Sequence, residues 1–397
     1  MRRLLQRLWQ DTSGSVIIYV AISMIALAAI GIVGVDVGKI MVARVDLQNA
    51  ADAGALAGAR MFLDGVAPSE GDIITESKDI AGMNRAFYDG APELIARDDI
   101  GVGVDMGAQE VTVRTESMVS HYFTGVIGRG RADAVQATAT AKLGAVCAAS
   151  CLKPWSIPDR HDDLTLIQGH GDWQNNGYYD HEDFVDVNEN RTWEPGESYE
   201  DTNNNGLFDQ ELYHPLITGY TASKDHGLQI NLKANNGGKP EPGQFWPIDL
   251  PDPEGSPGVG GSWYRWNIAN CNSSNIKPGD WLFTENGNMV GPTRHGMREI
   301  YDKDPNAIWE DGCECVSDSD YATSPRIGII PIHDPRWNIT PGKQEILVVK
   351  LAAFFIEDIR GNGEVVGRFM KLSAPGELCP EGTDNNGGFL FNLSLIE

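Results

Sequence analysis

Short oxygen-bearing side chains are concentrated between Gly171 and Glu211, where Asp, Asn or Gln recurs at alternate positions in three successive copies. The copies begin at Asp172, Asp186 and Asp201, so their period is about 14–15 residues. Each resembles the calcium-loop pattern D-x-[DN]-x-[DN]-G-x5-E, in which alternate side chains of a tight turn direct oxygens inward. We call the copies loops 1, 2 and 3, and together the Asp/Asn ladder. Their spacing predicts calcium as the cofactor.

The predicted metal ligands occupy positions 1, 3, 5 and 9 of each loop, and position 12 where that residue is acidic. They are Asp172, Gln174, Asn176, Asp180 and Asp183 in loop 1, Asp186, Asn188, Asn190, Glu194 and Glu197 in loop 2, and Asp201, Asn203, Asn205 and Asp209 in loop 3. Position 6 of loop 2 is Arg191 instead of the usual glycine. Leu212 at position 12 of loop 3 offers no oxygen, so this loop is expected to borrow a carboxylate from Glu200 or Glu211. The alternative is a solvated, Asn-rich linker that binds no metal.

Residues between the predicted ligands indicate which structure surrounds the loops. Pro195 argues against ordinary helices on both sides of each loop. The aromatic residues and Leu207 between the loops are expected to pack into a small core. The ladder is similar to the dockerin-like calcium repeats of secreted bacterial proteins.

Beside the ladder, the sequence offers a further candidate metal site. The segment HDDLTLIQGHGD groups His161, Asp162, Asp163, His170 and Asp172, and these side chains could hold a transition metal. The sequence contains no HExxH, GxSxG or P-loop motif. We therefore predict no catalytic residues and expect that the protein is not an enzyme.

The six cysteines are all candidates for disulfide bonds. They are Cys147, Cys151, Cys271, Cys313, Cys315 and Cys379. An even number fits an oxidising compartment, but spacing alone does not choose the pairing. Cys147 with Cys151 and Cys313 with Cys315 could alternatively form two halves of a zinc site, although the spacings differ from the usual C-x2-C.

The chain has 397 residues, a formal net charge of -25 and 41% hydrophobic residues. This length allows two or three domains with real cores. The negative charge disfavours nucleic acid and anionic lipid headgroups as partners, but it attracts divalent cations.

The N-terminal segment predicts the compartment. Residues Val16 to Val35 carry no charge, and a helix of about 20 residues spans the hydrocarbon core of a bilayer. Arg2, Arg3 and Arg7 precede it, so the N-terminus is expected in the cytoplasm and the rest of the chain outside. A cleaved secretory signal is the alternative, but its apolar region would be shorter.

The helix is expected to continue to about Phe62, with an Ala-rich face that another element must cover. Gly34 and Gly38 form a GxxxG pair that could mark helix association.

The run SGSVIIYVAISMIALAAIGIVGVDVGKIMVARVDLQNAADAGALAGAR resembles the N-terminal domain of TadG-like Flp pilus-assembly proteins. The resemblance implies a single-pass, pilin-like protein of the bacterial inner membrane whose partners are pilus or Tad secretion components. Related pilins are processed after a Gly that is followed, five positions later, by Glu. Here Tyr19 stands five positions after Gly14, so the resemblance does not carry the processing site across.

The predicted fold class is α+β, in three parts. Residues 1–63 form the anchor and extended pilin-like helix, and residues 64–146 form a small α+β module. Residues 147–397 form a mainly β exported domain with the calcium-type repeats at 172–212. Within the module, Ser69–Arg97 is predicted helical, and Glu110–Glu116 and Asp133–Lys142 alternate like strands.

The leading functional prediction is a membrane-anchored Flp/Tad pilus-assembly or pilin-like envelope protein with a calcium-stabilised exported domain. The alternative is a surface adhesin or matrix-binding module that uses a Tad-type anchor.

Overall fold

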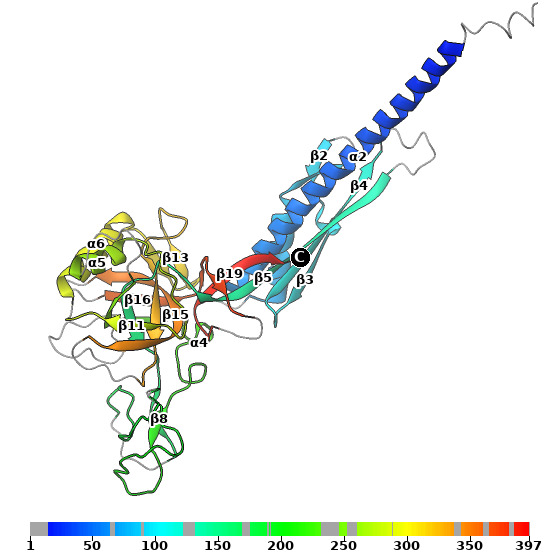
Figure 1. The fold of residues 1–397 in the computed structure, drawn as a ribbon. Helices are drawn as coiled ribbons and strands as arrows, with labels where there is room; N and C mark the ends of the chain where they lie inside the picture. Colours follow the sequence, from blue (N-terminus) through cyan, green and yellow to red (C-terminus); the bar gives the residue numbers. More distant parts are fainter. Residues whose placement is uncertain are drawn as a thin grey trace, which may run out of the picture. The chain divides into compact units, whose positions relative to one another are not determined.

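We describe the chain from a computed structural model (Figure 1). The residues described are 15–63, 68–88, 91–121, 132–168, 175–188, 190, 192–231, 246–251, 260–287, 289–336, 343–359, 365–380 and 385–396. Their contacts define two compact units, one within residues 1–62, 68–142 and 394–397, and the other within 63–67 and 143–393. Gly14 lies outside the described residues.

In its described residues, unit 1 combines two α-helices with a two-stranded hairpin and a separate antiparallel sheet. Its elements are α2 (Ser15–Arg60), the 3-10 turn η2 (Met61–Leu63), α3 (Glu70–Gly82), β1 (Arg85–Tyr88), β2 (Ala91–Leu94), the 3-10 turn η3 (Arg97–Asp99), β3 (Ile100–Asp105), β4 (Glu110–Ser120) and β5 (Ala132–Ala148), which runs on into unit 2. β1 pairs with β2, while β4 lies between β3 and β5. The predicted strands are therefore present, and both are longer than their sequence patterns indicated.

The helix α2 has two parts with different surroundings. Its first part exposes large apolar side chains such as Ile18, Ile25 and Leu27, whereas its second part buries small ones such as Ala51 and Ala55. The segment is long and apolar enough to cross a membrane. Continuous backbone hydrogen bonding lets one helix serve both surroundings, because no N–H or C=O is left unpaired in lipid.

The Ala-rich face of α2 is covered by α3 and β4. Thr115 of β4 donates a hydrogen bond to the carbonyl oxygen of Leu47 over 2.9 Å, and Lys39 donates one to the carbonyl oxygen of Ser120 over 2.7 Å. The larger residues Val42 and Val45 of the same helix are exposed. The alanines carry the packing because only small side chains allow this close approach.

The predicted helix over Ser69–Arg97 is wrong after Gly82. A capping box begins α3, since Ser69 Oγ accepts from the backbone of Asp72 and the Asp72 carboxylate accepts from the backbone of Ser69. Asn84 Nδ2 then donates to the carbonyl oxygen of Ile80 at the other end, and the chain turns into the β1–β2 hairpin. The aromatic, β-forming residues after Asn84 fit a strand as well as a helix, and the sheet decides between them.

Gly58 provides a test of this packing. A Cβ at Gly58 would collide with Ser77 Oγ of α3 and lie 3.0 Å from Val111 Cγ1 of β4. We expect Gly58→Ala to lower the stability of unit 1 by about 1–2 kcal/mol, because overpacking outweighs the better helix propensity of alanine. Reduced hydrogen-exchange protection of α3 and β4 amides would measure this loss.

The matched control is Gly38→Ala, because nothing lies within 4 Å of a Cβ built at Gly38. This substitution should leave the protection of α3 unchanged. Equal protection in the Gly58→Ala variant and the wild type would contradict the packing argument.

Unit 2 contains mainly β-structure. Its elements are β6 (Trp155–Pro158), β7 (Asp162–Ile167), β8 (Gln210–Leu212), α4 (Ala222–Asp225), β9 (Gln229–Asn231), β10 (Trp246–Asp249), α5 (Gly261–Ala269), β11 (Trp281–Thr284), α6 (Val290–Lys303), β12 (Ile308–Glu310), β13 (Cys315–Ser317), β14 (Ile327–His333), β15 (Glu345–Ile359), β16 (Val365–Met370), β17 (Leu372–Ser373), β18 (Glu377–Leu378) and β19 (Leu390–Ile396), whose last residues belong to unit 1. The strands predicted around 327–332, 345–356 and 364–372 are present as β14, β15 and β16.

Five strands of unit 2 close into a barrel. Hydrogen bonds follow the order β11-β10-β6-β14-β15, and β15 pairs back with β11. Closure leaves no free edge among these strands. Trp155 and Phe354 are fully buried in its core, and the Trp155 indole donates to the hydroxyl of Tyr264 in α5 over 2.7 Å.

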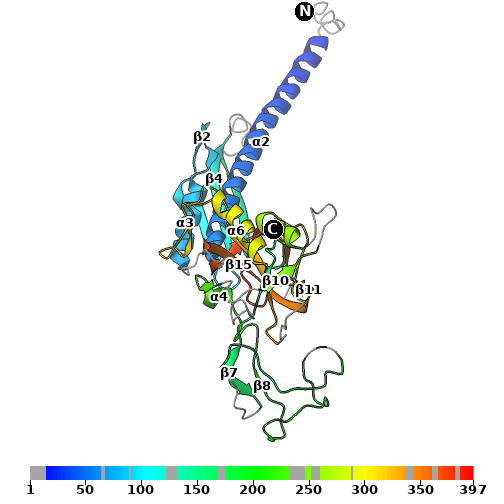
Figure 2. The ribbon, with the colours of Figure 1, turned by 90° about the vertical axis from the view of Figure 1, so that its left-hand side faces the viewer.

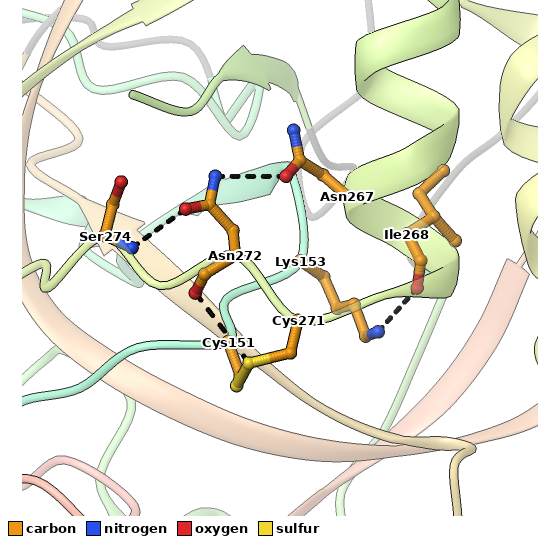
Figure 3. Close-up of a disulfide and its surroundings, with 7 residues drawn as sticks. All are labelled: Cys151, Lys153, Asn267, Ile268, Cys271, Asn272 and Ser274. Carbon is orange, nitrogen blue, oxygen red and sulfur yellow. Dashed lines mark hydrogen bonds between the residues drawn. A yellow bond between two sulfur atoms is a disulfide. The ribbon is translucent and has the colours of Figure 1, made fainter. Parts of the chain in front are cut away.

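All six cysteines form disulfides within unit 2. The pairs are Cys147–Cys379, Cys151–Cys271 and Cys313–Cys315, with Cα atoms 4.8, 4.2 and 5.2 Å apart. The zinc half-site of Cys147 and Cys151 is therefore not formed, because each bonds a distant partner. Figure 3 shows Cys151 bonded to Cys271 beside Lys153, whose Nζ donates to the carbonyl oxygen of Ile268.

Candidate metal centre

The Asp/Asn ladder forms the irregular segments around β7 and β8 in unit 2 (Figure 2). Of the predicted ligands, Asp172 and Gln174 lie outside the described residues, as does Arg191. Within 175–188 and 192–212, the only regular element is the short strand β8, and no helix flanks a loop. The loops therefore depend on side-chain hydrogen bonds for their shape.

Loop 3 is wound around the carboxylate of Asp209. Asp201 accepts the backbone N–H groups of Asn205 and Gly206 over 3.1 and 2.7 Å. The side-chain amides of Asn203 and Asn205 both donate to Asp209 Oδ2, from Asn205 over 2.8 Å. Gly206 has a φ of 76°, the left-handed backbone that position 6 requires. Positions 3, 5 and 9 of this loop are thus brought together.

Loop 2 repeats this network. Asp186 accepts the backbone N–H of Asn190 over 3.1 Å, and the amides of Asn188 and Asn190 donate to the Glu194 carboxylate over 3.1 and 3.2 Å. Glu197 at position 12 accepts the backbone N–H of Glu194 over 2.9 Å. In loop 1, Asn176 likewise donates to Asp180 Oδ2 over 2.9 Å. In loops 2 and 3 the side-chain amides at positions 3 and 5 donate to the position 9 carboxylate, and in loop 1 Asn176 does the same. Asp183, predicted as the position 12 ligand of loop 1, is exposed instead.

The asparagine amides are compatible with a bound cation. An amide carries an oxygen and a nitrogen at nearly equivalent places, so a flip of the group exchanges donor for acceptor. With a cation beside the position-9 carboxylate, the flipped amides of positions 3 and 5 would present oxygens to it. Ca²⁺ takes about 6–8 oxygen ligands, which a loop of this type supplies from side chains and one backbone carbonyl.

Three ladder carboxylates are buried, and in the described part of the chain only Glu211 has a basic side chain, His161, within salt-bridge distance. Glu182 is 2% exposed, while Asp209 and Glu211 are fully buried. Among the described residues, none of the three pairs with Lys or Arg, and neither Asp209 Oδ1 nor Glu211 Oε1 has a hydrogen-bond partner. Burial raises the pKa of Glu211 to about 7, and nearby Asp163 and Asp180 raise it as well. Burying unpaired carboxylates costs several kcal/mol, which a bound cation would offset.

A second donor set shares Glu211. His161 Nε2 lies 3.6 Å from Asp163 Oδ1 and 3.5 Å from Glu211 Oε2, and the three groups offer ligand atoms within 4.8 Å of one another. Of the group proposed from sequence, His161 and Asp163 do meet, whereas His170 and Asp172 lie outside the described residues. Imidazole with carboxylates suits zinc and similar metals. Asp163 Oδ2 also accepts the backbone N–H of Gly177, so this set adjoins loop 1.

The expected aromatic core between the loops is present. Phe208 is 2% exposed and stacks on Trp193 with ring centroids 4.8 Å apart. Phe184 and Tyr199 meet Phe208 edge-on at 5.5 and 5.6 Å. Aromatic pairs of this geometry stabilise the loops beyond the area they bury. Leu207, in contrast, is exposed.

The prediction that loop 3 borrows a carboxylate from Glu200 or Glu211 is wrong. Glu200 is exposed, and Glu211 accepts the backbone N–H of Asp180 in loop 1 over 3.0 Å. The residue that faces loop 3 is Glu182, which accepts from Thr202 and from the backbone N–H of Asp209. Sequence reasoning missed Glu182 because it looked for position 12. The available signal was that Glu182 and Glu211 both occupy position 11 of their loops.

Comparison with known proteins identifies the N-terminal segment. Residues 14–61 match the family Tad, "Flp pilus-assembly TadE/G-like", which confirms the TadG-like resemblance for this segment. The match coincides with α2, Ser15–Arg60, and includes both its exposed apolar part and its packed part. No significant match was found among curated proteins or among solved structures. The family match does not extend to unit 2 or to the ladder.

Proposed function

We propose that the protein is a membrane-anchored, non-enzymatic component of a Flp/Tad pilus system, and that calcium stabilises its exported unit. The observation that carries the proposal is the coincidence of the Tad match with one helix that is apolar and exposed at first and packed afterwards. In this proposal the first part of α2 spans the inner membrane as a single pass. The second part belongs to a folded module, as expected of a pilin-like subunit.

The proposed orientation of the chain across the membrane follows from the positive charge before its apolar segment. Arg2, Arg3 and Arg7 precede the apolar segment and favour a cytoplasmic N-terminus. Unit 2 then lies in the periplasm or outside the cell, where disulfides form and persist. The three disulfides of unit 2 support this placement.

Calcium is the proposed cofactor because the ladder brings oxygen ligands together around buried carboxylates. Extracellular calcium sites have affinities of about 10⁻⁴–10⁻³ M, which is sufficient where calcium is plentiful. The buried, unpaired oxygens of Asp209 and Glu211 support a cation in the paired loops. Bound calcium would lock the ladder and protect it from proteolysis.

Deletion of the gene is expected to abolish or strongly reduce Flp pili, counted per cell by electron microscopy. The full chain should restore them. A chain in which residues 1–36 are replaced by a cleavable signal should be exported without an anchor and should not restore them, because it lacks the membrane-spanning part of α2.

The control for this experiment is the level of exported protein, measured in both complemented strains. Normal piliation of the deletion strain would contradict the proposal. If adhesion were lost while pili remained, the result would favour the surface adhesin that uses a Tad-type anchor.

A further inference from the structure

Loop 2 has a glutamate at position 12, and its contacts show where the carboxylate of that position lies. Glu197, at position 12, accepts two backbone N–H groups over 2.9 Å each: that of Val187 at position 2 and that of Glu194 at position 9. A glutamate at position 12 is the bidentate ligand of a calcium loop. These two hydrogen bonds hold its carboxylate against the loop, and they define where a twelfth-position carboxylate lies.

Loop 3 fills the same place with a residue from loop 1. Glu182 Oε1 accepts the backbone N–H of Thr202 at position 2 over 2.8 Å, and Oε2 accepts that of Asp209 at position 9 over 3.1 Å. These are the two backbone positions that Glu197 contacts in loop 2. Leu212, the residue at position 12 of loop 3 itself, has no oxygen in its side chain.

Loop 1 receives a residue from loop 3 in return. Glu211 Oε2 accepts the backbone N–H of Asp180 at position 9 over 3.0 Å. Position 2 of this loop, Trp173, lies outside the described residues. Asp183, at position 12 of loop 1, is exposed. Glu211 therefore makes the position 9 contact that Asp183 would make in a self-contained loop.

The exchange follows from how the two loops pair. Glu182 N–H donates to the carbonyl oxygen of Asp209, and Glu211 N–H donates to that of Asp180, each over 3.0 Å. His181 and Gln210 form an antiparallel bridge between these bonds. Both glutamates stand at position 11 of their loops, so each side chain leaves its own loop and reaches the other across the bridge.

A separate observation points to a ligand in this pair. Asp209 Oδ1 and Glu211 Oε1 belong to fully buried residues and have no hydrogen-bond partner in the described part of the chain. Native proteins rarely leave buried carboxylate oxygens unsatisfied, because the desolvation cost is not recovered. Asp209 stands at position 9 of loop 3, and Glu211 is the loop 3 residue that contacts loop 1.

We propose that loops 1 and 3 form one paired calcium centre in which Glu182 is a ligand of the loop 3 site and Glu211 is a ligand of the loop 1 site. The inference rests on the proposed calcium binding and adds two ligands, Glu182 and Glu211, to the set predicted from the loop spacing. Each site is built from both loops, so filling one site orders the bridge that supports the other. Calcium binding to this pair is therefore cooperative.

The test is calcium titration of the full-length chain in detergent micelles by isothermal calorimetry. Glu211→Gln and Glu182→Gln should each weaken calcium binding to the pair at least tenfold and remove its cooperativity. Asp183→Asn and Glu200→Gln are the matched controls, and both should bind as the wild type does. Unchanged Trp fluorescence without calcium would show that the variants are folded.

The opposite pattern would overturn the exchange. If Asp183→Asn weakens binding while Glu211→Gln does not, loop 1 is self-contained. Loss of zinc binding but not of calcium binding in Glu211→Gln, in a parallel zinc titration, would assign Glu211 to the His161 set instead. A wild-type chain that binds no calcium would refute the proposed calcium stabilisation itself, and the exchange with it.

Discussion

Chelation of calcium is expected to lower the thermal unfolding midpoint of unit 2 by about 10–30 °C. A ligand present at about 10–100 times its dissociation constant stabilises the folded state by about 1.4–2.7 kcal/mol per site. Three sites would contribute about 4–8 kcal/mol, and in a unit of this size each kcal/mol shifts the midpoint by about 2–4 °C. The physical reason is that Glu182, Asp209 and Glu211 are buried without Lys or Arg partners among the described residues.

Differential scanning calorimetry of the full chain, with calcium and with a chelator, measures this shift. Magnesium at the same concentration is the control, because it demands tighter octahedral geometry and gives up its waters reluctantly. It should restore little of the lost stability. Identical midpoints in calcium and in chelator would refute calcium stabilisation.

Removal of the Cys147–Cys379 disulfide is expected to destabilise unit 2 by about 5 kcal/mol. This bond joins residues 232 positions apart, so it restricts a very long loop of the unfolded chain. The chain-entropy relation gives about 5 kcal/mol for a loop of that length, and more than for any shorter loop. The paired variant Cys147→Ser/Cys379→Ser, unfolded with denaturant at fixed calcium, measures the loss.

The chain supplies its own control for this measurement. Cys313 and Cys315 are separated by 2 positions, so their disulfide closes a minimal loop and restricts the unfolded chain far less. Cys313→Ser/Cys315→Ser should therefore change stability much less than the first pair. Similar losses for the two pairs would contradict the entropic account and indicate a cost in the folded state.

The features that could be predicted from sequence are those that depend on the spacing of residue types over a short stretch of the chain. The uncharged run from Val16 to Val35 predicted the apolar part of α2. The Asp/Asn spacing predicted side chains that meet within one loop, as those at positions 3, 5 and 9 of loop 3 do. Alternating residues also predicted β4 and β5. In each case the residues that cooperate lie within a few positions of one another, so the sequence order is enough.

The features that sequence missed depend on distant partners. The contacts of Glu182 with loop 3 and of Glu211 with loop 1 span 27 and 31 positions and follow from the pairing of the loops. Closure of the barrel through β11 and β15, and the choice of Cys379 as the partner of Cys147, are also long-range. The helix assigned to Ser69–Arg97 failed because its apolar residues fit either period, and only the sheet selects the β1–β2 hairpin.

The Cys147–Cys379 bond also determines how the molecule responds to mechanical tension. A force applied between α2 and a point directly after Cys379 has a covalent path along the chain to Cys147 and through the two sulfurs. The polypeptide between them, which includes the barrel and the ladder, is bypassed and stays slack while the bond is intact. Reduction of this single bond would transfer the pull onto the polypeptide between the two cysteines.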